Sequence, residues 1–468
     1  MYTSAVPATD PLPGKPGEAA ASRLARLISC RTVSSPDPEG ADAREFARFA
    51  ELLAELYPRV HAELELERVN GGGLLYRWAA GGGQSGGEPA SPPPDPVVLM
   101  AHYDVVPVED EAAWEHPPFA GRIVDGFIHG RGTLDDKGQL AAILEAVETL
   151  LAEQFVPSRD VYLSFGDNEE TAGDTAAAIA ETLAARGVTP WLVLDEGGAV
   201  AAQAFPFVNR PVAVVGVSEK GILDVELSVE DPGGHASTPS RLGATARLAR
   251  AVVRLDNRPF PAALHPVTVE MLHRLAAGAP FLPRLLFARA GALRRPLARV
   301  FGALGGEPNA LTRTTVAVTR LQGSKASNVL ATRASATANV RIAPGESIGS
   351  VLLRMEHTIR DRNVSLRVVN GTGPSPVSST DSAQFALLEA VIAEVFPDAL
   401  AAPYIMLAGT DSRRFTTICS NVYRFAPFRM DKAARASIHA DNEKLSIKTF
   451  GEGIRFYRRL LQHLTAEA

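Results

Sequence analysis

Three apolar runs that alternate with helical segments constrain the fold of this chain more than any other feature. The runs cover Val97–Met100, Val161–Phe165 and Trp191–Leu194, and each has the length of a short strand. Between them, apolar residues recur at helical spacing over Leu140–Leu151, and Thr175–Arg186 is rich in alanine. Runs that are apolar throughout are typical of strands covered on both faces. The alternation therefore predicts an α/β fold with a doubly wound, mostly parallel sheet.

A histidine and several acidic residues follow these strands, at the ends where doubly wound sheets bind ligands. His102 and Asp104 come directly after the first run, and an acid-bearing glycine loop follows at 130–138. The second run leads into Gly166–Glu170, and the third leads into Asp195. We expect the following side chains at one edge of the sheet: His102, Asp104, Asp135, Glu169, Glu170 and Asp195.

The pair His102 and Asp104 has two interpretations when it is taken alone. The i, i+2 spacing places both side chains on one face if the strand continues, so that the Asp104 carboxylate can orient the ring of a metal-bound His102. On the other interpretation, His102 is only a hydrogen-bonded histidine at the end of a strand. The carboxylates at the two other strand ends favour a metal site.

Length, charge and cysteine content limit the class of protein. A chain of 468 residues is too long for one core, so we expect two domains. The formal net charge of −6 at pH 7 gives no support for a nucleic-acid partner. No apolar stretch reaches the roughly 18 residues of a membrane span, and the N-terminal sequence lacks the pattern of a secretory signal. The two cysteines, Cys30 and Cys419, are too few for a disulfide framework, and we predict a cytoplasmic protein.

Periodicity and composition predict further elements. Helices are expected from about Glu18 to Ile28, from about Asp42 to Leu56 and over Asp381–Val395. A short strand is expected at Asn421–Phe425. The Gly- and Pro-rich residues 81–96 are expected to form an exposed loop without a chemical role.

The character of the sequence changes near Pro211. After it, Val212–Val217 and Leu223–Val229 alternate between apolar and other residues, as do Ala317–Leu321 and Ala334–Ile342. Alternation indicates strands with one exposed face, and we predict that the first two form an antiparallel pair.

These differences divide the chain into four parts. We predict a flexible arm over 1–18 and a larger domain formed by 19–211 and 373–468. A smaller α+β domain is inserted over 212–372, with a helical excursion at about 257–312.

Met271–Gly306, inside this excursion, is both apolar and cationic. It contains no acidic residue. Its arginines are Arg274, Arg284, Arg289, Arg294, Arg295 and Arg299. Three interpretations are open: solvated surface helices, an apolar cover over a hydrophobic substrate, or a face that contacts membrane lipid.

Six motifs, in this order, resemble those of the co-catalytic di-zinc exopeptidases, a family that includes carboxypeptidase G, aminoacylase, carnosinase, succinyl-diaminopimelate desuccinylase and carboxypeptidase S. They span roughly residues 20–465 and read AHYDVVP (101–107), GRGTLDDKG (130–138), NEETAG (168–173), LDEGG (194–198), GGHASTP (233–239) and HADNE (439–443). Within the family, the chain is most similar to carboxypeptidase S and to the enzymes that hydrolyse and synthesise N-fatty-acyl amino acids. This likeness rests on WEHPPF (114–119), VSEKG (217–221), GTDSR (409–413) and the long insert before Arg313.

The resemblance implies a site for two zinc ions. His102 and Asp195 would bind one ion. Glu170 and His439 would bind the other, and Asp135 would bridge the two. Zinc accepts imidazole and carboxylate ligands, and five protein ligands leave room for a shared hydroxide. Co²⁺ or Mn²⁺ are expected substitutes.

Three acidic residues beside these ligands receive other roles. Glu169 is the candidate general base, which would take a proton from water and pass it to the leaving amine. We expect Glu169 and Glu170 to point apart, because neighbouring residues in a strand-like segment do so. Asp104 would orient His102, and Asp136 is expected to be structural.

The inserted domain supplies the remaining site residues by resemblance. His235, in a Gly-Gly-His turn, matches a histidine that stabilises the oxyanion in this family and is often supplied by a partner subunit. This placement implies a homodimer and closure of one domain, as a lid, over the other. Arg341 matches the arginine that binds the substrate carboxylate, although Asn339 stands where the family usually has Asp. Asn328 matches a position near the oxyanion. The carboxylate end of the pocket would be lined by Gly409, Thr410 and Asp411, with Arg413 behind them.

The expected function is zinc-dependent hydrolysis, and in reverse formation, of the amide bond of N-acyl amino acids, with fatty acyl groups favoured by the apolar insert. The alternative is a carboxypeptidase or dipeptidase acting on Gly-Xaa-type peptides, with the same metal site. A metal-free binding protein on this scaffold would need a broken ligand set, whereas every ligand type is present. A nucleotide enzyme is not expected, because Gly130-Arg131-Gly132 lacks the full dinucleotide fingerprint and there is no phosphate-loop motif.

Overall fold

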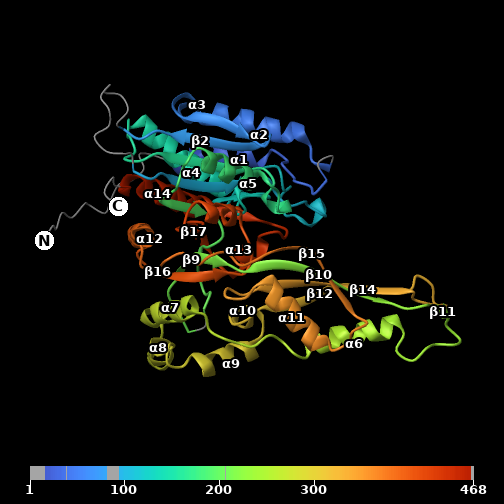
Figure 1. Ribbon diagram of the computed structural model, residues 1–468. Coiled ribbons are helices and arrows are strands. Elements are labelled where there is room, and N and C mark those ends of the chain that lie inside the picture. The colour runs from blue at the N-terminus through green and yellow to red at the C-terminus, as the bar shows by residue number, and fades with distance from the viewer. Residues whose placement is uncertain (1–15, 38–39, 82–93, 206, 465–468) are drawn as a thin grey trace. The chain divides into compact units, whose positions relative to one another are not determined.

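The chain forms two compact units in the computed structural model (Figure 1). Unit 1 contains the described residues up to Val215, together with Thr380–Ala401 and the residues from Thr410 onward. Unit 2 contains Gly216–Ser379 and Ala402–Gly409. The structure describes residues 16–37, 40–81, 94–205 and 207–464.

Most of the predicted arm (1–18) and of the predicted loop (81–96) lies outside the described residues. The end of the arm does not, since the first helix already begins at Pro16 and the prediction of a flexible arm to residue 18 was wrong there. Among the described helices, none combines the length and the hydropathy that a bilayer span requires.

The largest sheet has ten strands across the described residues, in the order β1-β2-β6-β3-β7-β17-β9-β8-β18, with β16 paired to β9. The strands β6, β3, β7 and β17 lie side by side in parallel. The strands are β1 Glu65–Val69, β2 Gly73–Trp78, β3 Val97–His102, β6 Val161–Gly166, β7 Leu192–Asp195, β8 Val200–Ala201, β9 Val212–Glu219, β16 Leu400–Met406, β17 Val422–Arg424 and β18 Arg429–Met430.

Helices pack on this sheet and make unit 1 an α/β structure, as predicted. Every residue of β3 and β6 is buried, because neighbouring strands and packed helices cover them. Ile179 and Leu183 of α5 belong to one apolar cluster with Val98 and Met100 of β3, while α4 packs against β3 and α14. The helices of unit 1 are α1 Pro16–Ile28, α2 Ala43–Leu56, α3 Pro58–Glu63, α4 Lys137–Ala152, α5 Thr175–Ala185, α12 Ala383–Val395, α13 Lys432–Ser437 and α14 Ile447–His463.

A small antiparallel sheet joins two distant parts of unit 1. It is formed by β4 (Arg122–Val124), β5 (Phe127–His129) and β19 (Lys444–Ser446). Lys444 pairs with His129 in this ladder. The pairing places the segment that precedes β19, which carries the HADNE motif, beside the glycine loop that follows β5.

Unit 2 is built on a four-stranded antiparallel sheet in the order β12-β14-β10-β15. The strands are β10 Gly221–Glu230, β12 Thr315–Gln322, β14 Arg333–Ile342 and β15 Ser365–Thr372; β11 (Gly234–His235) and β13 (Val329–Leu330) form a separate pair. Its helices are α6 Ala244–Asp256, α7 Pro266–Leu275, α8 Phe281–Ala288, α9 Arg294–Leu304, α10 Gly306–Ala310 and α11 Ile348–Ile359.

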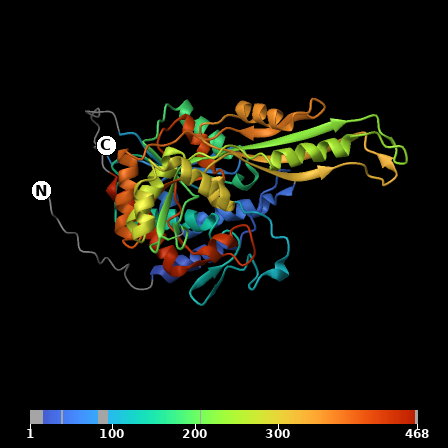
Figure 2. The same ribbon diagram turned by 90° about the horizontal axis from the view of Figure 1, so that it is seen from below.

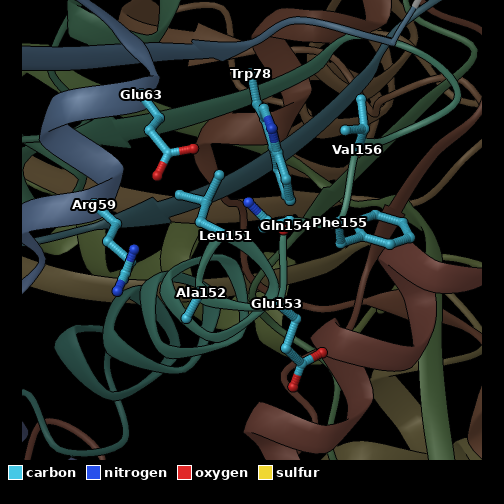
Figure 3. A pocket seen from close by; sticks show the side chains of 9 residues that line it. All are labelled: Arg59, Glu63, Trp78, Leu151, Ala152, Glu153, Gln154, Phe155 and Val156. Atoms are coloured by element: carbon cyan, nitrogen blue, oxygen red, sulfur yellow. The ribbon is translucent and has the colours of Figure 1, made fainter.

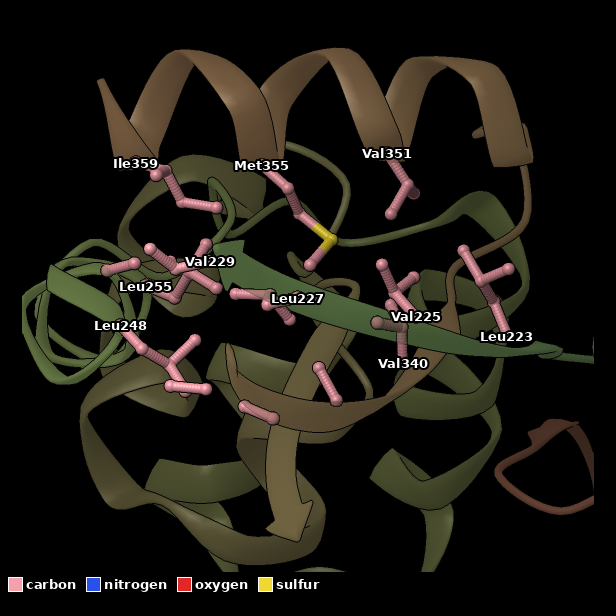
Figure 4. Close-up of a cluster of buried hydrophobic side chains, with 14 of the residues drawn as sticks. Leu223, Val225, Leu227, Val229, Leu248, Leu255, Val340, Val351, Met355 and Ile359 are labelled. Atoms are coloured by element: carbon pink, nitrogen blue, oxygen red, sulfur yellow. The ribbon is translucent and has the colours of Figure 1, made fainter. Parts of the chain in front are cut away.

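One face of this four-stranded sheet carries the core of unit 2. Burial alternates strictly along β10 and β14, so every second residue points into the core. Figure 4 shows Val351, Met355 and Ile359 of α11 pointing toward the buried side chains of β10. Leu248 and Leu255 of α6 belong to the same cluster.

The predicted antiparallel pair between Val212–Val217 and Leu223–Val229 was wrong. The first segment is β9, which lies in the ten-stranded sheet beside β17, β8 and β16, whereas the second is β10 in the four-stranded sheet. All but one of the residues of β9 are buried, so β9 does not have the exposed face that alternation would give it.

Shortening a core side chain of unit 2 should lower its local stability. Leu227 of β10 is fully buried, so we expect Leu227→Ala to reduce the free energy of opening of β10 and α11 by about 2–5 kcal/mol, measured by amide hydrogen exchange. Leu353→Ala on α11 is the control, because Leu353 is 68% exposed and its loss should change this free energy by less than about 0.5 kcal/mol. Equal protection in the two variants would contradict the assigned core.

Candidate metal centre

His102 is the last residue of β3 and presents both ring nitrogens to carboxylates. Its Nδ1 lies 3.1 Å from the carbonyl oxygen of Asp104 and 3.3 Å from that residue's carboxylate, so Nδ1–H donates to Asp104. Its Nε2 lies 3.0 Å from Oδ1 of Asp135. Burial disfavours the charged ring, but the hydrogen bonds to Asp104 and Asp135 outweigh it and raise the pKa of His102 well above its ordinary value. The site therefore favours a positive charge at Nε2, a proton or a metal ion.

Asp135 lies between two imidazoles. Its Oδ1 faces Nε2 of His102, and its Oδ2 lies 3.0 Å from Nε2 of His439. Burial disfavours the carboxylate, yet the hydrogen bonds from the two histidines lower the pKa of Asp135 below its ordinary range. One carboxylate that presents one oxygen to each of two histidines has the arrangement of a bridging ligand.

Asp135 was expected in the glycine loop, at the edge of the sheet where His102 lies, and it contacts His102 there. It lies in the loop that leads from β5 into α4, and a cis peptide joins it to Asp136. The Asp136 carboxylate accepts a hydrogen bond from the backbone N–H of His102 at 3.2 Å. Asp136 is fully buried and faces the backbone of β3, in keeping with the structural role expected of it.

Glu170 and His439 form the second half of the centre. Nε2 of His439 lies 3.1 Å from Oε2 of Glu170, while Oε1 of Glu170 is buried and has no hydrogen-bond partner among the described residues. Hydrogen bonds to Asp135 and Glu170 raise the pKa of His439 to about 10. The His439 side chain is 53% exposed, compared with 2% for that of His102, so the centre is accessible from the side of His439.

These donors fit a metal ion. Ligand atoms of His102, Asp135 and Glu170 all lie within 4.8 Å of one another. An unpartnered buried carboxylate oxygen is costly unless a cation satisfies it, and Oε1 of Glu170 is such an atom. Imidazole and carboxylate are donors that zinc and related ions accept.

Asp195 lies at the end of β7, which is the parallel neighbour of β3. It is buried, and its Oδ2 accepts a hydrogen bond of 2.8 Å from the backbone N–H of Ser412. Burial raises the pKa of Asp195 despite its hydrogen bonds. His102 and Asp195 therefore leave neighbouring strands at the same edge of the sheet.

Asp104 has a contact that the sequence did not indicate. Its two carboxylate oxygens accept the backbone N–H groups of Glu169 and Glu170, each at 3.1 Å. A buried carboxylate that accepts two main-chain hydrogen bonds fixes the turn that donates them. Asp104 thus contacts both His102 and the segment of Glu170.

Glu169 and Glu170 lie on a short 3-10 helix, Glu169–Thr171, rather than in the strand-like segment expected. The tight turn follows from Asp104, which binds the consecutive N–H groups of both residues. Burial, with the neighbouring carboxylates of Asp411, Asp135 and Glu170, raises the pKa of Glu169 well above its ordinary value. A carboxyl group with a raised pKa can both accept and return a proton near neutral pH.

Glu443, at the end of the HADNE motif, was missed by sequence reasoning. Its carboxylate is fully buried and accepts hydrogen bonds from one short segment of the glycine loop. The donors are Arg131 Nη1 (2.8 Å), Gly132 N (3.1 Å), Thr133 Oγ1 (3.5 Å), Leu134 N (2.7 Å) and Asp135 N (3.3 Å). Arg131 also donates to the carbonyl oxygen of Ala440 and lies over the ring of Trp114. Glu443 thereby joins the segments that carry Asp135 and His439.

Unit 2 brings two of the predicted residues together. His235 lies on β11, where it pairs with Val329, and the backbone N–H of Ala236 donates to the carbonyl oxygen of Asn328 at 3.0 Å. The backbone N–H of Ser237 donates to Nδ1 of His235 at 3.1 Å, so the hydrogen of the neutral ring is on Nε2. The exposed Nε2–H is a hydrogen-bond donor.

Arg341 lies on β14 in a short polar chain. Its Nε donates to the side-chain oxygen of Asn339 at 3.2 Å, and the Asn339 amide donates to Asp224 at 2.8 Å. Although position 339 is Asn where the family usually has Asp, its side-chain oxygen still accepts a hydrogen bond from Arg341, and its contact with Asp224 orients it. Asp224, on the neighbouring strand β10, is a further residue that the sequence did not single out.

Gly409, Thr410 and Asp411 do not share one unit. Gly409 ends the second segment of unit 2, whereas Thr410 and Asp411 belong to unit 1. Oγ1 of Thr410 lies 2.7 Å from Oγ of Ser412. Burial, together with the nearby Asp195, raises the pKa of Asp411 to about 8.

Two cavities in unit 1 are lined by residues other than these ligands. One, of about 450 Å³, is bounded by Trp78, Phe155 and Val156 with Arg59 and Glu63 (Figure 3). The other, of about 760 Å³, borders the metal-centre turn through residues that include Phe46, Tyr103, Asn168, Thr171 and Arg414. Neither is lined by a candidate metal ligand, so neither contains the metal centre.

Comparison with known proteins places the chain in a family. The sequence pattern of peptidase family M20/M25/M40 matches residues 98–463. The chain belongs to this family. Its members are metallopeptidases and related hydrolases of peptide or amide bonds, so the predicted resemblance and the predicted enzyme class are confirmed.

Relatives extend over nearly the whole of this M20 chain. A probable carboxypeptidase S-like protein of Dictyostelium discoideum is 36% identical over 452 residues, covering 95% of this chain and 84% of that protein. A human N-fatty-acyl-amino acid synthase/hydrolase is 37% identical over 372 residues, covering 79% and 74%. An M20 family metallo-carboxypeptidase from Sulfolobus solfataricus shares the fold, with a TM-score of 0.66, 17% identity and coverage of 95% and 98%.

Replacement of Glu443 should weaken metal binding without any change to a ligand. In Glu443→Gln an amide N–H₂ replaces one oxygen and faces N–H donors of the glycine loop, so the loop that carries Asp135 loses its anchor. We expect zinc affinity, measured by chelator competition, to fall by about 10–100-fold. Glu356→Gln, at an exposed position of α11, is the control and should leave the affinity unchanged. Equal affinities in the two variants would show that Glu443 does not support the centre.

Proposed function

We propose that this M20 family member is a di-zinc amidohydrolase that cleaves, and in reverse forms, the amide bond of N-acyl amino acids. The observation that carries the proposal is the position of Asp135 between His102 and His439, with Glu170 on the second histidine. The acyl-amino-acid substrate is supported by the 37% identity to the human N-fatty-acyl-amino acid synthase/hydrolase.

In the proposed centre, His102 and Asp195 would hold one zinc ion. Glu170 and His439 would hold the other, and Asp135 would hold both. When bound, such ions polarise a carbonyl group and make water acidic enough to attack near neutral pH. Asp104 would keep the Nδ1 hydrogen of His102 directed away from the metal, and this leaves Nε2 as the donor atom.

Glu169 would act as the general base and then as the general acid. Its carboxylate would accept a proton from the attacking water and later donate that proton to the nitrogen of the leaving amine. The new carbon–oxygen bond replaces the carbon–nitrogen bond, and the products are a carboxylic acid and an amino acid. The same residues would serve the reverse reaction, because both directions pass through one transition state.

Unit 2 would supply the groups that orient the substrate. The Nε2–H of His235 can donate to the oxyanion that forms from the amide carbonyl, with Asn328 near it. The guanidinium of Arg341 can bind the substrate carboxylate through two parallel hydrogen bonds. By resemblance, His235 would act across a homodimer.

Hydrolysis of peptides is the second candidate. It is supported by the carboxypeptidase S-like relative, which is 36% identical over 95% of this chain. The two candidates share the metal centre and the carboxylate site, and they differ in the group on the acyl side of the bond.

A substrate panel should separate these candidates. We expect kcat/KM for long-chain N-acyl-Phe or N-acyl-Leu to exceed that for Gly-Phe or Gly-Leu by about tenfold or more, since each buried methylene adds binding free energy. The purified, zinc-loaded full chain should be assayed by release of the free amino acid, which both substrate classes share. A tenfold preference for the dipeptides would favour the peptidase instead.

Glu169→Gln should separate proton transfer from metal binding. The glutamine side chain keeps the size of glutamate but cannot accept the proton, so kcat should fall by about 10²–10⁴-fold. Zinc content, measured by atomic emission, should remain that of the unmodified chain because Glu169 is not a proposed ligand.

Two further variants serve as controls for Glu169→Gln. Glu181→Gln, at an exposed position of α5, should keep both activity and zinc. His102→Ala should lose zinc as well as activity. Substantial turnover by Glu169→Gln would rule out Glu169 as the base.

A further inference from the structure

We propose that α8 and α9 of unit 2 form a docking surface for an anionic phospholipid bilayer. The surface, called here the α8–α9 surface, consists of residues 281–304. This inference does not depend on the proposed substrate, because it rests on the exposure and charge of two helices outside the metal centre. Figure 1 shows the two helices in succession, below the four-stranded sheet of unit 2, and Figure 2 shows them from below.

The helix α8 exposes its large apolar side chains. Phe281 is 72% exposed, Leu282 71%, Leu286 49% and Leu285 38%. At about 100° per residue these four positions fall within an arc of about 140°, so they form one apolar face. No residue of α8 is buried. An exposed apolar face of this kind is typical of a surface that binds another molecule or a membrane.

The helix α9 adds two more exposed apolar side chains. Val300 is 54% exposed and Leu304 is 66% exposed, and they lie one turn apart. Only Ala298 of this helix is buried. The two consecutive helices thus present six large apolar side chains to solvent.

Arginines accompany these apolar residues, and no acid offsets them. Arg284, Arg289, Arg294, Arg295 and Arg299 are all exposed. Among the described residues none of these five arginines forms an ion pair, and no acidic residue occurs between 271 and 306. The flanking acids are already engaged: Glu270 pairs with Arg274, and Glu307 accepts a hydrogen bond from Tyr404.

A partner for this surface must be both apolar and anionic. On α9, Arg294 and Arg299 flank the line of Val300 and Leu304 on its two sides, each about 80–100° around the helix from it. Arg295 lies on the face opposite that line. A second copy of the chain does not fit a symmetric contact here, because the surface would meet itself and oppose arginine with arginine. An anionic bilayer offers phosphate groups to the arginines and hydrocarbon to the phenylalanine and leucines at the depth of one helix.

Vesicle flotation tests this proposal on the full chain. We expect binding to phosphatidylcholine vesicles that contain about 30 mol% phosphatidylserine, and little binding to phosphatidylcholine alone. Binding should weaken as salt rises, because the charges are screened. No flotation with the anionic vesicles, or equal flotation with both, would overturn the proposal.

Two variants assign the binding to its apolar and cationic parts. The apolar variant is Phe281→Ser/Leu282→Ser/Leu286→Ser, and the cationic variant is Arg294→Glu/Arg295→Glu/Arg299→Glu. We expect each to lower the partition coefficient between water and the anionic vesicles by about tenfold or more. Two of the glutamates in the cationic variant lie in the first turn of α9, where negative charge stabilises a helix, so this variant should still fold. Each variant should keep the hydrolytic activity toward a soluble substrate without vesicles.

Matched variants elsewhere in unit 2 are the controls. Val253→Ser/Leu321→Ser/Leu353→Ser removes three apolar side chains that are 56%, 64% and 68% exposed. Arg250→Glu/Arg320→Glu/Arg362→Glu reverses three exposed arginines. Both should bind vesicles as the unmodified chain does, and a loss equal to that of the α8–α9 variants would refute the assignment. If the apolar triple variant changes the circular dichroism spectrum, Leu282→Ser alone replaces it with the same expected direction.

Discussion

The buried carboxylate of Glu443 connects the parts of unit 1 that must meet to form a metal centre. The glycine loop and the HADNE segment lie about 300 residues apart in sequence, as the contact from Arg131 to Glu443 illustrates. Burying a charge is costly, and Glu443 offsets that cost with hydrogen bonds from Arg131 and from the loop's own N–H groups. Because these donors precede Asp135 directly, the position of the Asp135 carboxylate depends on Glu443.

Asp104 is a second buried carboxylate that fixes a loop of the centre, in this case the turn that carries Glu169 and Glu170. The sheet delivers His102 and Asp195 at the ends of adjacent parallel strands, so their positions follow from backbone pairing. Glu169 and Glu170 lie on a turn, which has no such support, and the Asp104 carboxylate holds it through two N–H groups. Two buried carboxylates therefore position the segments that carry the remaining proposed ligands.

Sequence predicted the parts of this arrangement that depend on local pattern. The apolar runs correctly placed β3, β6 and β7, and His102 ends β3, Asp195 ends β7 and Glu170 follows β6 by a few residues. The sequence-based prediction failed where contacts between distant segments determine the structure. Strand β9 was assigned to the wrong sheet because a strand's partner is not encoded in its own periodicity. Glu443 was missed because its partners are mostly main-chain N–H groups, which have no sequence signature.

The segment Met271–Gly306 shows the same limit at the surface. In α7, Met271, Leu272 and Leu275 are buried, although their surroundings in sequence are as apolar and as rich in arginine as those of α8. In α8, Phe281 and Leu282 are instead mostly exposed. Composition cannot distinguish these cases, because burial depends on whether a neighbouring element covers the helix. Only the structure separates α7, whose apolar side chains are buried, from α8, whose apolar face is free for a bilayer.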